Sequence, residues 1–280
     1  MPSDIILAAT SDQHANSSVG LCPPEGAETT DGNRTMPSKA QLWLWDCWED
    51  FWKDVGELKQ KTKSKLYCLY NGDAIEGAAG SVQARRTTQL MHLEDDVQRY
   101  IRDRVFSVPK ALNPSKQWMI RGTESHVGKD EESLAKKLGC EPDADTNNRS
   151  RYHARIRIKG TLIDAQHHGS MGRLPRTEQA LMKYRAFDIL DEHAGLGLEI
   201  PNLVIRSHLH RFVDSGPDSR PMVPRVIQTP SWQLKTSYVH AKFPNAVPHI
   251  GGVIIIFRDN MAPQVIPKLY WPSLPTVEEV

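Results

Sequence analysis

The chain has 280 residues, of which 39% are hydrophobic and 25% are charged, a composition that excludes a disordered or fibrous protein. Its 35 lysine and arginine residues oppose 34 aspartate and glutamate residues, and a net charge of +1 gives no indication of a polyanionic partner. No apolar run is long enough to span a membrane, and the N-terminus lacks the pattern of a secretion signal, so we expect a cytoplasmic protein without membrane contacts.

The length suits one large α/β domain spanning residues 1–280, with a loop insertion at about 17–37 and a strand-rich C-terminal half. The oligomeric state is not indicated by any pattern in the sequence. Four cysteines lie at irregular spacing without a Cys-x-x-Cys pair, which argues against a zinc knuckle or a disulfide scaffold and predicts reduced, mostly buried thiols. They are Cys22, Cys47, Cys68 and Cys140.

In chain order, the first predicted elements are a strand at about 4–9, the Pro/Gly/Thr-rich loop 17–37 and a helix at about 39–60. In this helix, apolar residues recur at i, i+3, i+7 and i+10, which is typical of a core-facing stripe rather than of a ligand-binding box. The stripe consists of Trp45, Trp48, Trp52 and Val55.

A strand at 66–70 follows, then a helix at about 88–106, a strand ending at Gly122 and a short helix at 130–138 closed by Gly139. Further elements are expected in the second half of the chain. They are a hairpin at 152–165, a helix at 178–193, and strands at 203–205, 225–228, 252–257 and 264–269.

Five clusters of metal-type ligands each follow an apolar run that resembles a strand. The clusters are Asp12-Gln13-His14, Gly72-Asp73, Gly122-Thr123-Glu124-Ser125-His126, His167-His168-Gly169 and Ser207-His208-Leu209-His210. In open α/β sheets the carboxyl ends of neighbouring strands form one crevice, so ligands far apart in the sequence can meet there. Each cluster alone is a common pattern, and Asp73 alone would more often be a turn residue. The ordered set indicates a distributed metal site.

This ordered set resembles the calcineurin-like metallophosphoesterase family, in the version seen in bacteria and phages. The family pattern is Asp-x-His, Gly-Asp, Gly-Asn-His-Asp/Glu, His and Gly-His-x-His on successive strand ends. The chain departs from it in the third cluster, where Thr123 and Glu124 replace Asn-His, and in the fifth, where Ser207 replaces the usual glycine. The resemblance implies a four-layer α/β/β/α sandwich of two mixed sheets flanked by helices.

The resemblance also implies two divalent transition metal ions, with manganese favoured and iron, zinc or nickel as alternatives. Asp12, His14 and His210 would bind the first ion and His208 the second, while Asp73 would bridge both. Asp12 and His14, like His208 and His210, project to the same side if the backbone there is extended. A His-x-His at a strand end is alternatively a polar edge or an isolated half-site.

In two of the clusters, the sequence leaves more than one residue as the candidate metal ligand. In the fourth, His168 is the expected ligand because Gly169 follows it, and His167 would pack or face the substrate. In the third, threonine is a poor neutral ligand, so Glu124 is the expected oxygen donor, with His126 as the general acid. Alternatively, Glu124 orients a ligating histidine without binding metal.

Substrate recognition is less clearly indicated. Arg206 and Arg211 flank the last imidazole pair, and Arg173 follows the fourth cluster, so all three are candidate phosphate contacts. Basic residues also alternate with apolar ones from Arg149 to Lys159, which favours a solvated outer strand face over a track for DNA or RNA.

The sequence therefore predicts a binuclear, metal-dependent phosphoester hydrolase that favours phosphodiesters, with nucleic acid as a candidate substrate and nuclease activity as one form of it. Two alternatives stay open: a phosphomonoesterase acting on a nucleotide or phosphoprotein, and a non-catalytic module that binds metal or nucleic acid. The second of these is disfavoured because Asp12, His14, Asp73, His208 and His210 are all present.

Overall fold

Two mixed β-sheets form the centre of the molecule in the computed structural model, which describes residues 4–77, 90–128, 130–169, 178–220, 222–242 and 247–272. The first sheet has the order β13 (Gln264–Tyr270), β12 (Ile250–Phe257), β1 (Ile5–Thr10), β4 (Lys65–Asn71), β5 (Lys116–Ile120) and β6 (Ser150–Arg151). The second has the order β10 (Val213–Asp214), β11 (Arg225–Gln228), β9 (Leu203–Arg206), β8 (Thr161–Gln166) and β7 (His153–Ile158).

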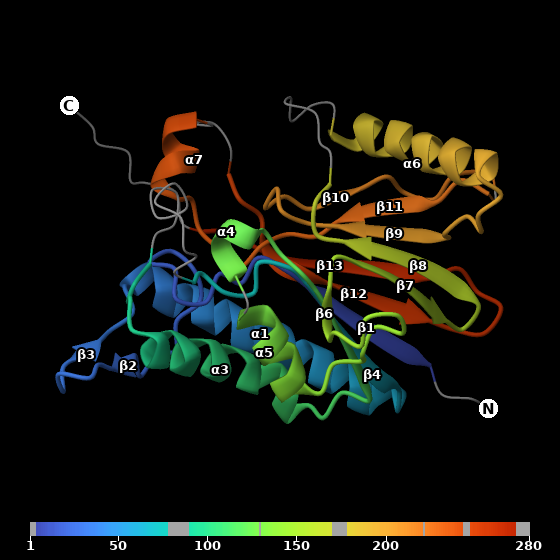
Figure 1. Ribbon diagram of the computed structural model, residues 1–280. Coiled ribbons are helices and arrows are strands. Elements are labelled where there is room, and N and C mark those ends of the chain that lie inside the picture. The colour runs from blue at the N-terminus through green and yellow to red at the C-terminus, as the bar shows by residue number, and fades with distance from the viewer. Residues whose placement is uncertain are drawn as a thin grey trace, which may run out of the picture.

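Helices cover the outer face of each sheet. The helices α1 (Lys39–Thr62), α3 (Asp95–Ala111) and α5 (Asp130–Leu138) pack on the first sheet, and α6 (Glu178–Gly195) covers the second (Figure 1). The remaining described elements are short: β2 (Ala27–Glu28), β3 (Arg34–Thr35), α4 (Glu124–Val127) and α7 (Ser237–Lys242). The helix, sheet, sheet and helix layers are the α/β/β/α arrangement that the resemblance to the metallophosphoesterases implies.

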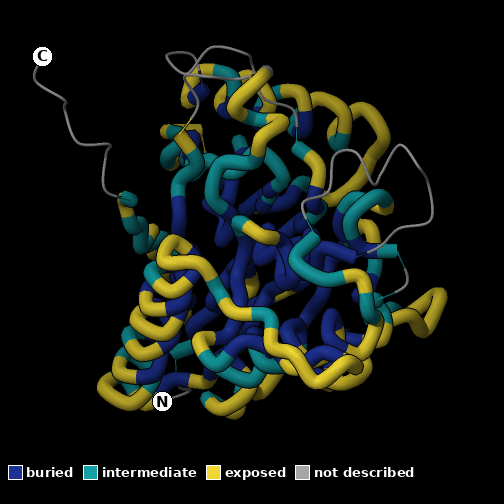
Figure 2. Tube along the Cα trace, turned by 90° about the vertical axis from the view of Figure 1, so that its left-hand side faces the viewer, coloured by how far each residue is buried: buried dark blue, intermediate teal, exposed yellow. Residues whose placement is uncertain are grey.

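The burial pattern follows from this layering. Side chains alternate across each strand, so residues such as Leu7 on β1 and Ile163 on β8 point into the core between the sheets, while Ile6 points toward the helices. Figure 2 shows the buried segments running through the middle of the molecule under a more exposed outer surface.

The aromatic stripe of α1 is a core face, as predicted. Trp45, Trp48, Trp52 and Val55 are all buried, and Trp48 makes edge-to-face contacts with Trp52 and with Trp232 at ring-centroid distances of 5.4 and 4.8 Å. The start of the helix is fixed by a capping box between Ser38 and Gln41.

Most predicted elements are present with small shifts in their ends, but the helix expected at 88–106 begins later. Helix α3 starts at Asp95, so Leu90 lies outside it and Leu93 is exposed instead of forming part of its apolar face. The acidic residues Asp95 and Asp96 lie in its first turn, where they interact favourably with the helix dipole. The part of this prediction at residues 88–89 lies outside the described residues.

The stretch from Arg149 to Lys159 is not one alternating strand, because Ser150–Arg151 form β6 in the first sheet and β7 belongs to the second. Tyr152, expected on the apolar face, is 62% exposed, and exposed and buried residues alternate in β7 alone. The arginines of β7 already have partners: Arg157 pairs with Glu199 at 2.6 Å, and Arg155 donates to the Glu199 carbonyl. Lys159, just after the strand, pairs with Asp259 at 2.8 Å. This pairing supports a solvated, internally neutralised face.

All four cysteines are buried free thiols, as expected. Among the described helices, none combines the length and the apolarity that crossing a membrane requires.

We expect Trp48→Ala to lower the free energy of unfolding by about 3–5 kcal/mol, because it leaves a cavity between α1 and the first sheet. Urea unfolding of the variant measures this loss. The matched control is Trp271→Ala, since Trp271 is 57% exposed, and equal losses in the two variants would contradict the assignment of the core.

Candidate metal centre

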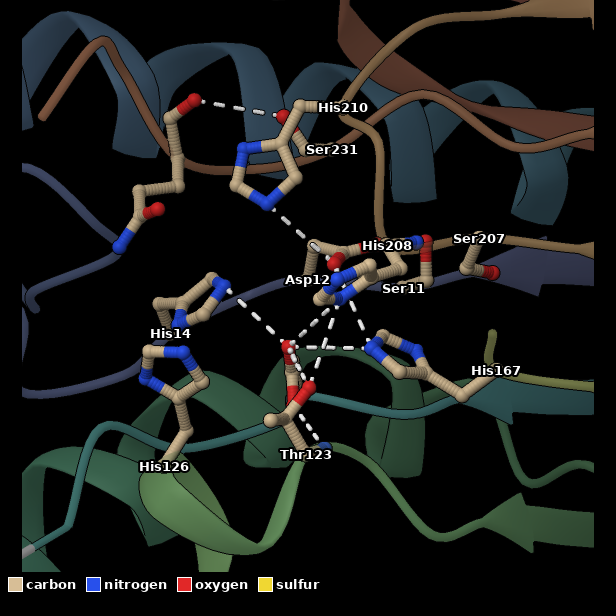
Figure 3. A network of polar contacts seen from close by, with 12 residues as sticks. Ser11, Asp12, His14, Thr123, His126, His167, Ser207, His208, His210 and Ser231 are labelled. Atoms are coloured by element: carbon tan, nitrogen blue, oxygen red, sulfur yellow. Dashed lines mark hydrogen bonds and ion pairs between the residues drawn. The ribbon is translucent and has the colours of Figure 1, made fainter. Parts of the chain in front are cut away.

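Residues from both sheets meet at one edge of the molecule, where β1, β4, β5, β8 and β9 end. Figure 3 shows Asp12, His14, Thr123, His167 and His208 converging there from different strand ends. The backbones of the first two clusters are joined directly, because the amide of Asp12 donates to Gly72 O at 2.9 Å and that of His14 donates to Asp73 O at 3.0 Å.

The backbone at these residues is left-handed rather than extended, which corrects the expected i, i+2 strand geometry. The φ angles are 53° at Asp12, 42° at His14, 51° at Asp73, 75° at His208 and 54° at His210. Non-glycine residues adopt this conformation at a cost of the order of 1 kcal/mol each, and such residues concentrate at functional sites. The side chains converge because the chain curls at each strand end.

The carboxylate of Asp73 lies at the centre of the cluster. Its Oδ2 atom is 3.0 Å from His167 Nε2, 3.8 Å from His14 Nε2 and 3.8 Å from His208 Nδ1. Asp12 Oδ1 is 3.3 Å from His210 Nε2 and 3.9 Å from His167 Nε2. One carboxylate therefore lies between imidazoles that come from three separate clusters.

The donor atoms suit divalent cations. Asp12, His14 and His210 form one group whose ligand atoms lie within 4.8 Å of one another, and Asp12, Asp73, His167 and His208 form a second. Asp12 Oδ1, His14 Nε2 and His167 Nε2 are buried and have no hydrogen-bond partner among the described residues. Buried polar atoms are rarely left unpaired, and a mixture of carboxylate oxygen and imidazole nitrogen is a set that transition metals prefer.

Glu76 is a site residue that the sequence patterns did not reveal. Its buried carboxylate accepts from both His14 Nδ1, at 2.6 Å, and His126 Nδ1, at 2.7 Å. The only sequence signal is an acidic residue three positions after Asp73. By accepting from Nδ1 of each ring, Glu76 fixes the orientation of both rings and leaves their Nε2 atoms outside these bonds.

Charge coupling within the cluster shifts several pKa values. Burial alone would raise the pKa of Asp12, but His210 and His167 outweigh it and lower that pKa to about 2. Burial lowers the pKa of His167, yet Asp73 and Asp12 raise it to about 10. His126 behaves similarly, and its bond to Glu76 and the nearby carboxylates raise its pKa to about 9. Without metal, the His167 and His126 imidazoles are therefore charged near neutral pH.

The third cluster differs from expectation because Glu124 begins a helix. Residues two apart in a helix point about 200° away from each other, so Glu124 and His126 lie on different sides of α4. The Glu124 side chain is 58% exposed and binds Arg121 at 2.9 Å and the Tyr152 hydroxyl. The structure brings His126 to the site and does not bring the Glu124 carboxylate among the donors.

Thr123 takes the inward position instead. Its amide donates to Asp73 Oδ1 at 2.6 Å, and its hydroxyl lies 3.3 Å from Asp73 Oδ2, 3.3 Å from His168 Nε2 and 3.4 Å from His208 Nδ1. The threonine that replaces the family's asparagine thus contributes an oxygen at the same edge of the cluster.

Both histidines of the fourth cluster lie near the centre, but in different ways. His167 is buried, and its Nδ1 lies 2.7 Å from the Asn71 carbonyl while Nε2 faces Asp73. His168 is exposed and forms a further candidate ligand group with His167 and His208. The geometry favours His167 as the inner ligand, whereas the sequence favours His168.

Two of the arginines expected to contact the substrate are instead paired with acidic residues. Arg206 bonds to the Asp164 carboxylate at 2.8 Å, and Arg211 pairs with Glu178 at 2.7 Å, so both guanidinium groups have protein partners. Arg173 lies outside the described residues.

Two buried polar groups hold the loops of the centre together. Glu131 accepts from the amides of Ala74 at 3.0 Å and Gly122 at 2.8 Å, which ties the second cluster to the third. The hydroxyl of Ser207 lies 2.7 Å from Thr229 Oγ1. The serine at the family's glycine position is therefore part of a hydrogen-bond network with Thr229 and Asn71.

Comparisons with known proteins give distant structural likenesses only. No protein-family model matches the chain, and neither does any curated protein sequence. Vacuolar Protein Sorting 29 from Cryptosporidium parvum has a TM-score of 0.43 and 7% identity over 96% of this chain and 98% of its own. A predicted phosphoesterase from Streptococcus pneumoniae has a TM-score of 0.35 and 9% identity over 96% and 100% of the two chains.

A 5'-nucleotidase precursor from Thermus thermophilus has a TM-score of 0.39 and 13% identity, and the match covers 95% of this chain but 54% of the precursor. These likenesses are too distant to identify an activity. The function has to be inferred from the residues of the centre.

The stability of the metal-free protein should fall as the pH rises from 7 to 10. The pKa of His167 is about 10 in the folded protein against 6.5 ordinarily, so its contribution is complete below pH 6.5 and is lost as the pH rises through 10. Thermal midpoints measured with a chelator present test this expectation. A His167→Gln variant should show a shallower fall, and identical profiles would contradict the assignment.

Gly122→Ala should disrupt the centre, because an added Cβ would lie 2.2 Å from the amide nitrogen and from Oδ1 of Asp73. We expect the metal content, measured by elemental analysis after dialysis, to fall by about tenfold or more. Gly195→Ala is the control, since nothing lies within 4 Å of its added Cβ. Full metal content in both variants would argue against the packing at Asp73.

Proposed function

We propose that this protein is a metal-dependent phosphoester hydrolase with two divalent cations, and that it prefers phosphodiesters. The observation that carries the proposal is the convergence on the carboxylate of Asp73 of buried ligand atoms from Asp12, His14 and His167 that make no hydrogen bond. A binding protein for one structural zinc would require only a closed set of four ligands. Here two candidate donor groups lie side by side, and Asp12 belongs to both of them.

In this proposal, Asp12, His14 and His210 would hold the first cation, and Asp73, His167 and His208 would hold the second. Asp73 Oδ2 also lies 3.8 Å from His14 Nε2, so this carboxylate would be near both cations. Thr123 contributes its hydroxyl or orients Asp73, and His168 stands at the outer rim. When bound, two such cations would supply hydroxide at neutral pH and neutralise the phosphoryl oxygens. Manganese is the favoured metal, with iron, zinc and nickel as alternatives.

His126 is the proposed general acid. Glu76 accepts from its Nδ1, so Nε2 is the nitrogen that can donate a proton to the leaving oxygen. The same carboxylate holds His14, which links the position of the proton donor to that of a metal ligand. The His126 ring centroid is 5.0 Å from that of His14, so the donor stands beside the centre.

A phosphomonoesterase acting on a nucleotide or phosphoprotein is the main alternative, because the same centre can hydrolyse either ester. A non-catalytic module that binds metal or nucleic acid is the third possibility, and it would leave the pair formed by Glu76 and His126 without a chemical role. Hydrolysis of mono- and bis-aryl phosphates, measured side by side with added manganese, separates the three functions.

Asp73→Asn should reduce bis-aryl phosphate turnover by about 100-fold or more, because an amide cannot supply the shared anionic oxygens. Asp188→Asn is the control, since that side chain is 65% exposed on α6. Fewer than about two metals per chain in the wild type, together with no turnover of either ester, would overturn the proposal.

Glu124→Gln should keep both metals and change turnover by no more than about twofold, because the carboxylate is exposed and bonded to Arg121 and Tyr152. Elemental analysis and steady-state kinetics measure the two quantities. Loss of one metal in this variant would instead restore Glu124 as a direct ligand.

A further inference from the structure

A cavity of about 220 Å³ lies between α6 and the outer face of the second sheet. His168 and Gly169 line one end of it, and His168 Nε2 is 3.3 Å from the Thr123 hydroxyl in the candidate centre. The cavity therefore adjoins the place where a phosphoryl group would be bound. Helix α6 lies across this face of the sheet in Figure 1.

The polar wall of the cavity is already neutralised. Asp164 is buried, and its two oxygens accept from His153 at 2.6 Å and from Arg206 at 2.8 Å. Arg206 also donates to the carbonyls of Asp164 and Ile205. Arg206 is therefore paired with a buried carboxylate, and Arg185, which also lines the cavity, lies 3.7 Å from Asp188. Because both guanidinium groups have acidic partners, they are less available to a second phosphate.

Apolar side chains line the cavity from both sides. Met182 and Ile189 on α6 and Val226 on β11 are buried, and Leu196 and Leu198, which follow α6, are 68% and 47% exposed. A thioether and branched aliphatic groups form a surface on which a flat ring can pack.

Hydrogen-bonding groups lie on the same rim. Glu192 offers a carboxylate, and His193 donates from Nδ1 to the Glu199 carbonyl at 3.0 Å, which leaves Nε2 as an acceptor. A lining that mixes aliphatic side chains with hydrogen-bonding groups suits an uncharged heterocycle better than an alkyl chain. The volume is below the roughly 300–1,000 Å³ of pockets for drug-sized ligands, which limits the occupant to about one ring system.

We propose that this cavity binds the nucleobase of a substrate whose phosphate is held at the candidate metal centre. The inference rests on the proposed function and names its substrate class as a nucleoside phosphodiester. His168 lines both the centre and the cavity, so a phosphate and its attached nucleoside can occupy the two together.

The test compares two diesters with the same leaving group, thymidine 5'-(4-nitrophenyl) phosphate and methyl 4-nitrophenyl phosphate, using the manganese-loaded protein. We expect kcat/KM for the thymidine ester to exceed that for the methyl ester by about tenfold or more. In Ile189→Phe, which fills the cavity, this advantage should disappear while methyl ester turnover is retained. Tyr184→Ala is the control, because Tyr184 is 68% exposed on α6.

Binding is measured separately from hydrolysis, by titrating the protein with thymidine 5'-monophosphate and with inorganic phosphate and following chemical shifts by NMR. Tighter binding of the nucleotide in the wild type, lost in Ile189→Phe, supports the cavity. Equal affinities for the two anions, with methyl ester hydrolysis intact, would contradict nucleobase binding in the cavity and leave the proposed hydrolase function standing. An absence of hydrolysis of every ester overturns the proposed function, and the binding comparison still decides for or against the cavity.

Discussion

The buried carboxylate of Asp73 is the group on which the rest of the centre depends. A carboxylate removed from water is costly unless positive charge compensates it, and here the compensation comes from imidazoles of three other clusters. The same carboxylate accepts from the amide of Thr123, so it also fixes the path of the third cluster. Removing the charge would leave the surrounding imidazoles without a counterion and the loops without a shared acceptor.

The fold supplies the geometry that this charge requires. Strands β1, β4 and β5 are parallel neighbours in one sheet, and β8 and β9 are parallel neighbours in the other, so five strand ends face one edge. Glu131 joins two of the loops through backbone amides, and Glu76 joins two imidazoles. Each of these carboxylates links two segments of the centre, which limits how far each loop can move independently of the others.

The ends of the strands could be predicted from the sequence because each ligand cluster follows a short apolar run. This was enough to predict that Asp12, Asp73 and His208 lie close together, as they do in the structure. In the third cluster, the directions of the Glu124 and His126 side chains depend on where helix α4 begins. A helix of four residues is too short to leave a periodic pattern in the sequence. The pairing of Glu76 with His126 joins residues 50 positions apart, and no local pattern indicates such a contact. The choice between His167 and His168 depended on burial, which differs between adjacent residues at the end of a strand.

The left-handed backbone at the ligand positions has a consequence for how this chain can change. Glycine adopts that conformation without steric cost, so replacing Asp12, His14 or His210 by glycine would relieve strain while removing a ligand. The five bulky, ionisable side chains at these positions therefore converge at a conformational cost, which the hydrogen bonds between the strand-end loops have to offset.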